Sequence, residues 1–474
     1  MSSGLAPGGV APPAYARAWS GSGPLARPAD RALAAVGALC FKAFLAAQFL
    51  SLTRLFFSEH LGEGITAIAS QVGVLSVALL LPAVVAYGLG SGSMFGTLVP
   101  QARLWVTLVL GLSLVLFVYG LVQEFAVNTV VHDLAPYLVI LVSVVLGSVR
   151  RAWADSDRTI LLLFAAAIVV NAVGMTEMTT VVSEGDPEVR AARDVLAYRT
   201  QWALAFWPLL LLTARLRRPA TALFILAGSF FVLAQQVLFQ KRSPTVRIAL
   251  FMLVLLVVLP WLRREGGGGG ERRMAAMIVG VGTFTVVLAL TLAPWLFRGQ
   301  VSGLARRLSG EGYRGGPAAM LTWENERYFE AGMFLRTLRP QEVVFGRGFG
   351  GYFVADEPGW GVWMDDLHQV ASRALHVGVL MPFFKGGLVF SVAYYAGLAL
   401  ALARGRRALS DPFAAAAFFV VLLHAVFLLE ESWFSLSSSF DLVMVGLCMG
   451  YLLSWERDVV AGPGPRRPAG SAPA

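Results

Sequence analysis

Long apolar stretches, separated by short polar and often basic stretches, run through almost the whole chain. A helix needs about 20 mostly apolar residues to cross a bilayer. Stretches near that length predict membrane spans at residues 32–57, 65–89, 104–122, 134–149, 159–178, 201–214, 219–238, 246–262, 274–296, 378–403, 412–430 and 434–454. The pattern therefore predicts an all-α polytopic membrane protein with about twelve transmembrane helices.

The composition agrees with this reading. Of the 474 residues, 57% are hydrophobic and 14% are charged, whereas a soluble domain is about half apolar and about a quarter charged. The net charge of +9 is spread over short clusters between the apolar stretches, as expected for loops that orient membrane helices, and we expect no nucleic-acid partner. Cys40 and Cys448 lie in apolar stretches near opposite ends of the chain, so we expect free thiols and no disulfide.

The distribution of Lys and Arg predicts the orientation. Basic clusters at 150–151, 215–218, 263–273 and 403–407 alternate with loops at 58–64 and 123–133 that contain neither Lys nor Arg. The positive-inside rule then places both termini in the cytoplasm. The expected organisation is a flexible cytoplasmic tail (1–31), helices one to nine (32–296), a large external loop (297–377), helices ten to twelve (378–454) and a second cytoplasmic tail (455–474).

Two external segments carry candidate chemistry. The short loop Gln240–Arg247 holds Lys241, Arg242 and Arg247, which either extend to the membrane interface or bind an anion. The large loop is too long for a connector and contains several Trp and Tyr residues, so we expect it to fold over the membrane helices.

The end of the large loop has a helical polar pattern. At about 100° per residue, Asp366 to His376 places His368, His376 and Arg373 on one polar arc and Val, Leu and Ala on the other. This predicts an amphipathic helix at the outer interface, with a kink near Pro382. The helix is either only interfacial or part of a site, since histidine moves protons near neutral pH and arginine binds phosphates.

Lys385, inside the tenth span, is expected to be a paired or functional cation because an unpaired charge is costly in a membrane. Metal binding by Asp365 with Asp366, or by Glu59 with His60, is an alternative that the short motifs favour less, and we expect no metal and no cofactor.

The order of these motifs resembles the superfamily of O-antigen ligases and O-antigen polymerases. In HVGVLMPFFKGGL, His376 precedes Gly387 and Leu388 at the spacing that closes the family's large loop. NERYFEAGMFLRTLRPQEVVFGRGFGGY is similar to the family's Arg, short helix and Gly-x-Gly turn, and it supplies Arg327 and Gly348. KRSPTVR resembles the family's basic residue at the outer start of an earlier helix, so Arg242 or Arg247 takes that role. Many ligases have Asn, Ser or Gln directly after the histidine, and Val377 departs from this pattern. The departure disfavours a ligase more than a polymerase, because the polymerases vary more at this position.

The resemblance implies a GT-C-like fold with its active site in a periplasmic loop between helices nine and ten. It implies metal-independent polymerisation of oligosaccharide units linked to polyprenyl pyrophosphate, in a bacterial inner membrane. His376 would activate the acceptor hydroxyl, and Arg327 would stabilise the leaving pyrophosphate. The substrate-binding residues would be Arg242, Arg247, Arg373, His368, Tyr352 and Gly348. The expected partners are the lipid-linked glycan, the bilayer, a flippase and a chain-length regulator.

Two alternatives stay open. The first is a ligase that transfers the finished glycan to lipid A core or to a protein. The second is a multi-helix transporter or flippase, which the long loop after the ninth span and the lack of an internal repeat favour less.

Overall fold

The structure is a computed structural model of the whole chain. It describes residues 28–52, 72, 75–91, 98–180, 220–221, 223–225, 227–229, 231, 326–355, 370–372, 375, 377–409, 412–429 and 439–454. The predicted spans at 201–214, 246–262 and 274–296, and most of the one at 219–238, lie outside these residues.

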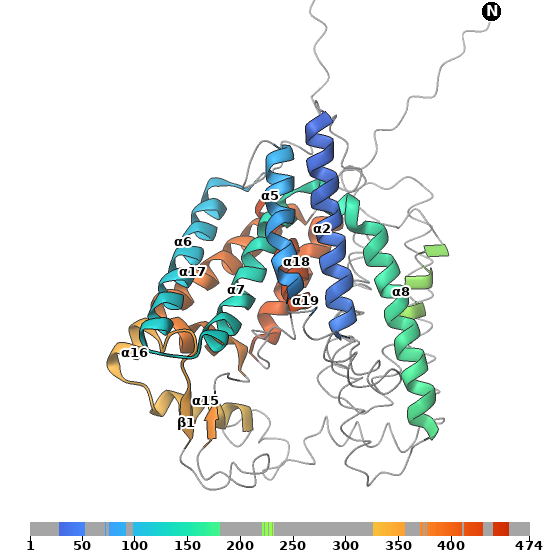
Figure 1. Cartoon of the computed structure of the whole chain (residues 1–474). Helices are drawn as coiled ribbons and strands as arrows, with labels where there is room; N and C mark the ends of the chain where they lie inside the picture. Colours follow the sequence, from blue (N-terminus) through green and yellow to red (C-terminus); the bar gives the residue numbers. More distant parts are fainter. Residues whose placement is uncertain are drawn as a thin grey trace, which may run out of the picture.

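The described part is mainly helical (Figure 1). Four helical segments are long and apolar enough to cross a membrane: Pro28–Leu50, Pro100–Val122, Val127–Ser148 and Gly378–Ala408. The helices are α2 (Pro28–Leu52), α5 (Leu80–Ser91), α6 (Pro100–Val122), α7 (Val127–Ser148), α8 (Arg150–Thr180), α17 (Met381–Gly405), α18 (Pro412–Phe427) and α19 (Ser439–Ser454). The prediction of a helical membrane protein is confirmed, while the number of twelve spans stays a prediction.

The outer faces of α6 and α17 are apolar. Leu104, Val115 and Val118 on α6, and Leu388 and Val392 on α17, are more than half exposed. Large apolar side chains exposed in this number would be unfavourable in water, and lipid tails solvate them well. These faces are therefore the bilayer-facing surface of the bundle.

Small residues bring α7 and α19 into close contact. A side chain at Gly446 would collide with Ser143, one at Gly450 with the backbone of Val144, and one at Gly147 with the backbone of Leu447. Gly446 and Gly450 are four residues apart and so lie on one face of α19, as in the small-xxx-small pattern of membrane helices. Close backbone packing at this face stabilises the pair of helices, because the hydrophobic effect gives little driving force for association within a lipid bilayer.

An aromatic side chain joins α6 to α17. Trp105 Nε1 donates a hydrogen bond to the carbonyl of Ala393 at 2.8 Å. Gly397, one turn further on, leaves the space that the indole occupies. In hydrocarbon this bond satisfies a donor that has no water available, so it fixes the relative height of the two helices.

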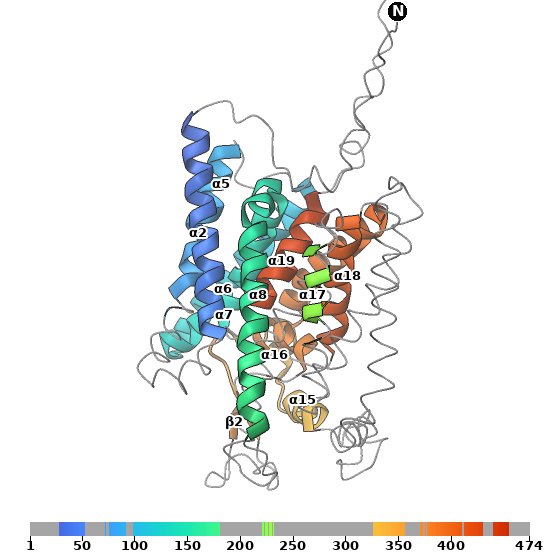
Figure 2. The ribbon, with the colours of Figure 1, turned by 90° about the vertical axis from the view of Figure 1, so that its right-hand side faces the viewer.

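The described part of the large loop lies at the end of the bundle where α6 turns into α7 (Figure 1). It contains α15 (Glu326–Arg336), α16 (Pro340–Phe345) and the strands β1 (Phe353–Ala355) and β2 (Val370–Ser372). The strands pair antiparallel, with Val354 opposite Ala371. Figure 2 shows β2 and α15 beyond the same end of the bundle.

The strand β2 corrects one prediction. Residues 366–376 were expected to form a single amphipathic helix, but Val370–Ser372 is extended and pairs with β1. Tertiary pairing therefore overrides the helical periodicity there. After Val377 the chain continues as a 3₁₀ turn, Gly378–Leu380, into α17, where Pro382 occupies the first turn and the interruption lies at Gly387.

Candidate functional site

The helix α17 is interrupted in its second turn, at Gly387. Gly387 has φ 61° and ψ −161°, which is far from helical geometry. The interruption frees two carbonyls, and the large loop supplies their donors: Arg347 N–H donates to Phe384 O at 3.0 Å and Gly348 N–H donates to Lys385 O at 2.8 Å. Non-helical backbone at the edge of a membrane bundle is tolerated when neighbouring protein satisfies it in this way.

The loop that supplies these donors needs its glycines. Gly346, Gly348 and Gly350 have φ of 69°, 78° and 87°, a region that side chains other than glycine rarely occupy. A Cβ on Gly348 would lie 2.6 Å from the ring of Tyr119, and one on Gly350 would lie 2.7 Å from Phe125. FGRGFGG therefore forms a tight turn whose backbone lies close to α6 and α17.

A buried ion pair holds the same loop. Lys385 Nζ lies 2.6 Å from Asp133 Oδ2 on α7, and the lysine side chain is only 1% exposed. Asp133 Oδ2 also accepts the N–H of Gly350 at 2.7 Å, and Lys385 Nζ donates to Gly351 O at 2.9 Å. Three segments far apart in sequence therefore meet at one pair of charges. The prediction that Lys385 is a paired cation is confirmed.

Arg347 joins the ends of the neighbouring elements. Its guanidinium donates to Glu342 Oε2 at 3.2 Å, to Tyr352 O at 2.8 Å and to Thr337 O at 2.9 Å, and it stacks over the ring of Phe334 at 5.7 Å. Most N–H donors of Arg347 are used within the protein. Its main role is therefore to hold α15, α16 and the start of β1 together.

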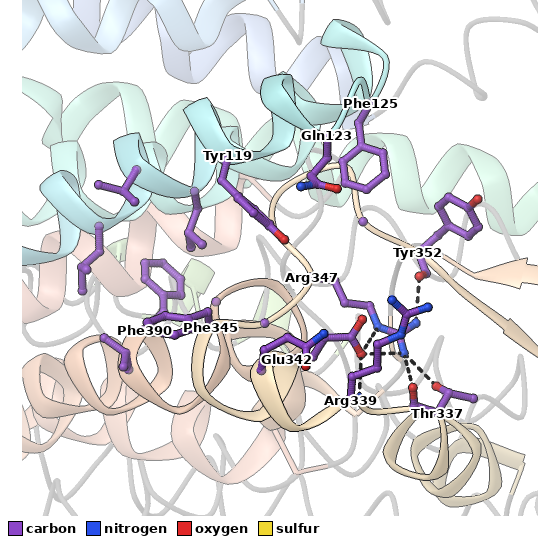
Figure 3. A pocket seen from close by; sticks show the side chains of 18 residues that line it. Tyr119, Gln123, Phe125, Thr337, Arg339, Glu342, Phe345, Arg347, Tyr352 and Phe390 are labelled. Carbon is purple, nitrogen blue, oxygen red and sulfur yellow. Dashed lines mark hydrogen bonds and ion pairs between the residues drawn. The ribbon is translucent and has the colours of Figure 1, made fainter.

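These contacts enclose a cavity of about 660 Å³ between α6, α16 and α17, within the range of small-molecule sites. Figure 3 shows the apolar part around Phe345 and Phe390, and the charged part around Arg339, Glu342 and Arg347. Tyr119 on α6 and Gln123, directly after the end of α6, point inward (Figure 3). The complete lining is Leu112, Val115, Leu116, Tyr119, Gln123, Phe125, Thr337, Arg339, Gln341, Glu342, Phe345, Gly346, Arg347, Gly351, Tyr352, Gly386, Val389 and Phe390.

The cavity includes one of the predicted substrate-binding residues and adjoins another. Tyr352 lines it and is 47% exposed, and Gly348 lies in the loop beside it. Arg327 is in the first turn of α15, with a side chain outside the described part. His376, His368, Arg373, Arg242 and Arg247 also lie outside the described residues. The flanking residues Leu375 and Val377 are buried at the start of α17.

Sequence reasoning missed Asp133, Arg339 and Arg347. Asp133 was assigned to an external loop, but α7 begins at Val127 and includes it. The sequence did indicate a role for Asp133, because an acidic residue so close to an apolar stretch needs a partner. Within the described ranges, no group of three His, Cys, Asp or Glu side chains is arranged to hold a metal ion.

Comparison with known proteins gives no relative: no family model, no curated protein and no solved structure matches the chain.

Proposed function

We propose that this protein is a membrane glycosyltransferase that polymerises oligosaccharide units carried on polyprenyl pyrophosphate. The proposal places it in a bacterial inner membrane, with the large loop on the periplasmic side and both termini in the cytoplasm. The donor is the lipid-linked glycan, and the acceptor is the hydroxyl of a second lipid-linked glycan.

One observation carries the proposal. The segment with the Arg, short helix and Gly-x-Gly pattern, residues 326–353, folds back onto the membrane helices and walls a cavity that is polar at one end and apolar at the other. A glycan attached to a lipid needs such a boundary site, because its reacting carbon lies beside a diphosphate and its carrier lies in hydrocarbon.

The chemistry assigned to the loop is a single displacement. The acceptor oxygen bonds to the anomeric carbon while the bond from that carbon to the diphosphate oxygen breaks, and the lipid diphosphate leaves with the electron pair. His376 accepts the hydroxyl proton. Arg327, together with Arg242 or Arg247, stabilises the charge on the departing diphosphate, and Arg373 and His368 contact the glycan. No metal or cofactor takes part.

A polymerase is preferred to a ligase because Val377 follows the histidine, where many ligases have a polar residue. The side chain of Val377 is buried, with 4% of it exposed.

Complementation of a gene deletion tests the proposal. The deletion strain receives wild type, His376→Ala, Arg327→Ala or, as a matched control, Arg406→Ala, whose exposed side chain lies at the other end of α17. Each variant is first shown to reach the membrane, and surface glycan is then separated by gel and blotted.

The expected result is loss of long chains, with single repeat units retained on the acceptor, in the deletion, His376→Ala and Arg327→Ala strains. Complete loss of glycan from the acceptor, with long lipid-linked polymer accumulating, would identify a ligase instead. Normal chain length with His376→Ala would refute the catalytic role of the loop and favour a transporter or flippase.

A further inference from the structure

The helix α2 carries a charge close to the middle of the membrane. Its segment Pro28–Leu50 is long and apolar enough to cross a bilayer, and Lys42 lies well inside it, fourteen residues after Pro28 and ten before Leu52. At a rise of about 1.5 Å per residue, these separations are about 21 Å and about 15 Å. A lysine side chain extends only about 6 Å, so its ammonium reaches neither end of α2 and stays within the hydrocarbon.

Lys42 has no partner in the described part of the chain. The residue is half-buried, and none of the described residues gives it a hydrogen bond or an ion pair. The four predicted spans that lie outside or mostly outside the described residues, 201–214, 219–238, 246–262 and 274–296, contain neither Asp nor Glu. Since an unpaired charge is costly at this depth, a carboxylate from outside this chain is the expected partner.

The side of α2 next to Lys42 is open. Val36 and Leu39 are 49% and 69% exposed, and Ala43 and Ala46 are exposed as well. With Lys42 they fall on one side of the helix at about 100° per residue, and we call these five positions the Lys42 face. Figure 2 shows α2 at one edge of the bundle. The small alanine side chains allow the backbone of another helix to approach closely.

Two other occupants fit the Lys42 face less well. Headgroup phosphates lie about 15 Å from the middle of the bilayer, beyond the reach of Lys42. A second copy of this chain has the same orientation in the membrane, so a symmetric contact would place Lys42 against its own counterpart. These like charges would repel each other, and Asp30, the acidic residue of α2, lies twelve residues away from Lys42.

We propose that the Lys42 face binds a transmembrane helix of another membrane protein, and that this helix carries an Asp or Glu at the matching depth. The carboxylate pairs with the ammonium of Lys42, and the backbone of the partner helix packs against Ala43 and Ala46. The contact is independent of the proposed function, because no residue of α2 lines the cavity and α2 precedes the large loop by many residues.

Synthetic transmembrane peptides test the charge pairing. The probe is a biotinylated helix of Leu and Ala, about 23 residues long, with one Glu at its centre and a photoreactive leucine beside it. Matched peptides carry Gln or Lys at the centre, or Glu near one end. The intact protein is reconstituted with each peptide in phosphatidylcholine bilayers and irradiated, and labelled segments are located by mass spectrometry.

Four variants separate charge from bulk. Lys42→Met removes the charge and keeps the length of the side chain, and Lys42→Glu reverses the charge. Ala43→Trp fills the Lys42 face without changing its charge, whereas Leu104→Trp adds a tryptophan to the bilayer-facing surface of α6. Monodispersity in size-exclusion chromatography shows that each variant is folded.

We expect the central-Glu peptide to label α2 about tenfold more than the Gln peptide does, the size of one polar contact inside a membrane. Labelling should fall about tenfold in Lys42→Met and Ala43→Trp and stay unchanged in Leu104→Trp. Lys42→Glu should instead favour the peptide with a central Lys. Equal labelling by the Glu and Gln peptides, or undiminished labelling in Lys42→Met, would overturn the proposal.

A second experiment identifies what covers the Lys42 face in the host membrane. Benzoylphenylalanine replaces Leu39 in the full chain, and the adducts formed on irradiation are identified by mass spectrometry. We expect an adduct with a membrane protein that has Asp or Glu inside an apolar span, and loss of this adduct in Lys42→Met. Adducts only with lipid, with a second copy or with another segment of this chain, or no adduct that depends on Lys42, would overturn the proposal.

Discussion

The buried pair of Lys385 and Asp133 gives a quantitative prediction. The perturbation is Lys385→Met, which keeps the length and the apolar stem of the side chain and removes the ammonium group. It leaves the carboxylate of Asp133, 10% exposed, without its counter-charge, and Gly351 O without its donor at 2.9 Å. Both consequences destabilise the joint between α7, the glycine loop and α17.

The magnitude follows from the geometry. At 2.6 Å and an effective dielectric constant of about 20, Coulomb's law gives about 6 kcal/mol of attraction before desolvation. Removing one partner of a buried pair typically costs about 3–5 kcal/mol, since the other charge stays buried. We therefore expect Lys385→Met to lower the free energy of unfolding by about 4 kcal/mol, and Asp133→Asn by about as much.

The double variant distinguishes the pair from two unrelated losses. Asp133→Asn with Lys385→Met leaves no unpaired buried charge, and the Asn oxygen can still accept the N–H of Gly350. The double variant should lose far less than the sum of the single losses, with a coupling energy of about 3 kcal/mol.

The assay is reversible unfolding of the purified protein in one detergent, fitted for the free energy of unfolding. Limited proteolysis of the loop at 346–351 reports the same joint locally. Lys42→Met on α2 is the control, because Lys42 is half-buried and has no ion pair among the described residues. Single variants as stable as the wild type, or a coupling energy of zero, would refute the assigned role of the pair.

Further predictions concern the backbone and the packing. Gly387→Ala should destabilise by more than about 2 kcal/mol in the same unfolding assay, because its φ of 61° is strained and its Cβ meets Val344. Gly111→Ala, where a Cβ meets nothing within 4 Å, should leave the free energy of unfolding unchanged or raise it slightly. An equal loss of stability in both variants would contradict the role of Gly387 in the kink of α17. Arg347→Gln should speed protease cleavage within residues 337–352, because hydrogen bonds to Tyr352 O and Thr337 O are lost. An unchanged cleavage rate would show that these bonds do not hold the segment. Gly450→Val should disrupt α7–α19 contact and reduce the folded yield in the membrane, and wild-type yield would refute that contact.

Local pattern predicted the membrane helices well where the apolar stretch was uninterrupted, as for α6. It started the fourth span too late, at residue 134, because His132 and Asp133 suggested a loop, whereas α7 begins at Val127. The charge of Asp133 is satisfied by Lys385, a partner distant in sequence, so a helix continues through residues that appear unfavourable on their own. Periodicity also misassigned Val370–Ser372, since pairing with β1 depends on a segment before it.

For the candidate site, too, local sequence predicted some features and only the fold shows the others. The glycine loop was recognisable from its composition. Tyr352 was expected to bind substrate, which stays a prediction, and the structure places it in the lining of the cavity. Arg339 and Arg347 were indistinguishable in sequence, since each is an arginine near a short helix. Only the fold shows that one is engaged by Glu342, Thr337 and Tyr352 while the other faces the cavity.

The kink in α17 and the glycine loop depend on each other. Without the loop, the carbonyls of Phe384 and Lys385 would lack donors at the membrane edge, and α17 would gain by closing into a regular helix. Without the kink, the N–H groups of Arg347 and Gly348 would lose their acceptors. Since α16 leads into this loop and lines the cavity, the shape of the cavity depends on the contact between kink and loop. A change at Gly387 or Lys385 should therefore alter the cavity, although neither residue lines it.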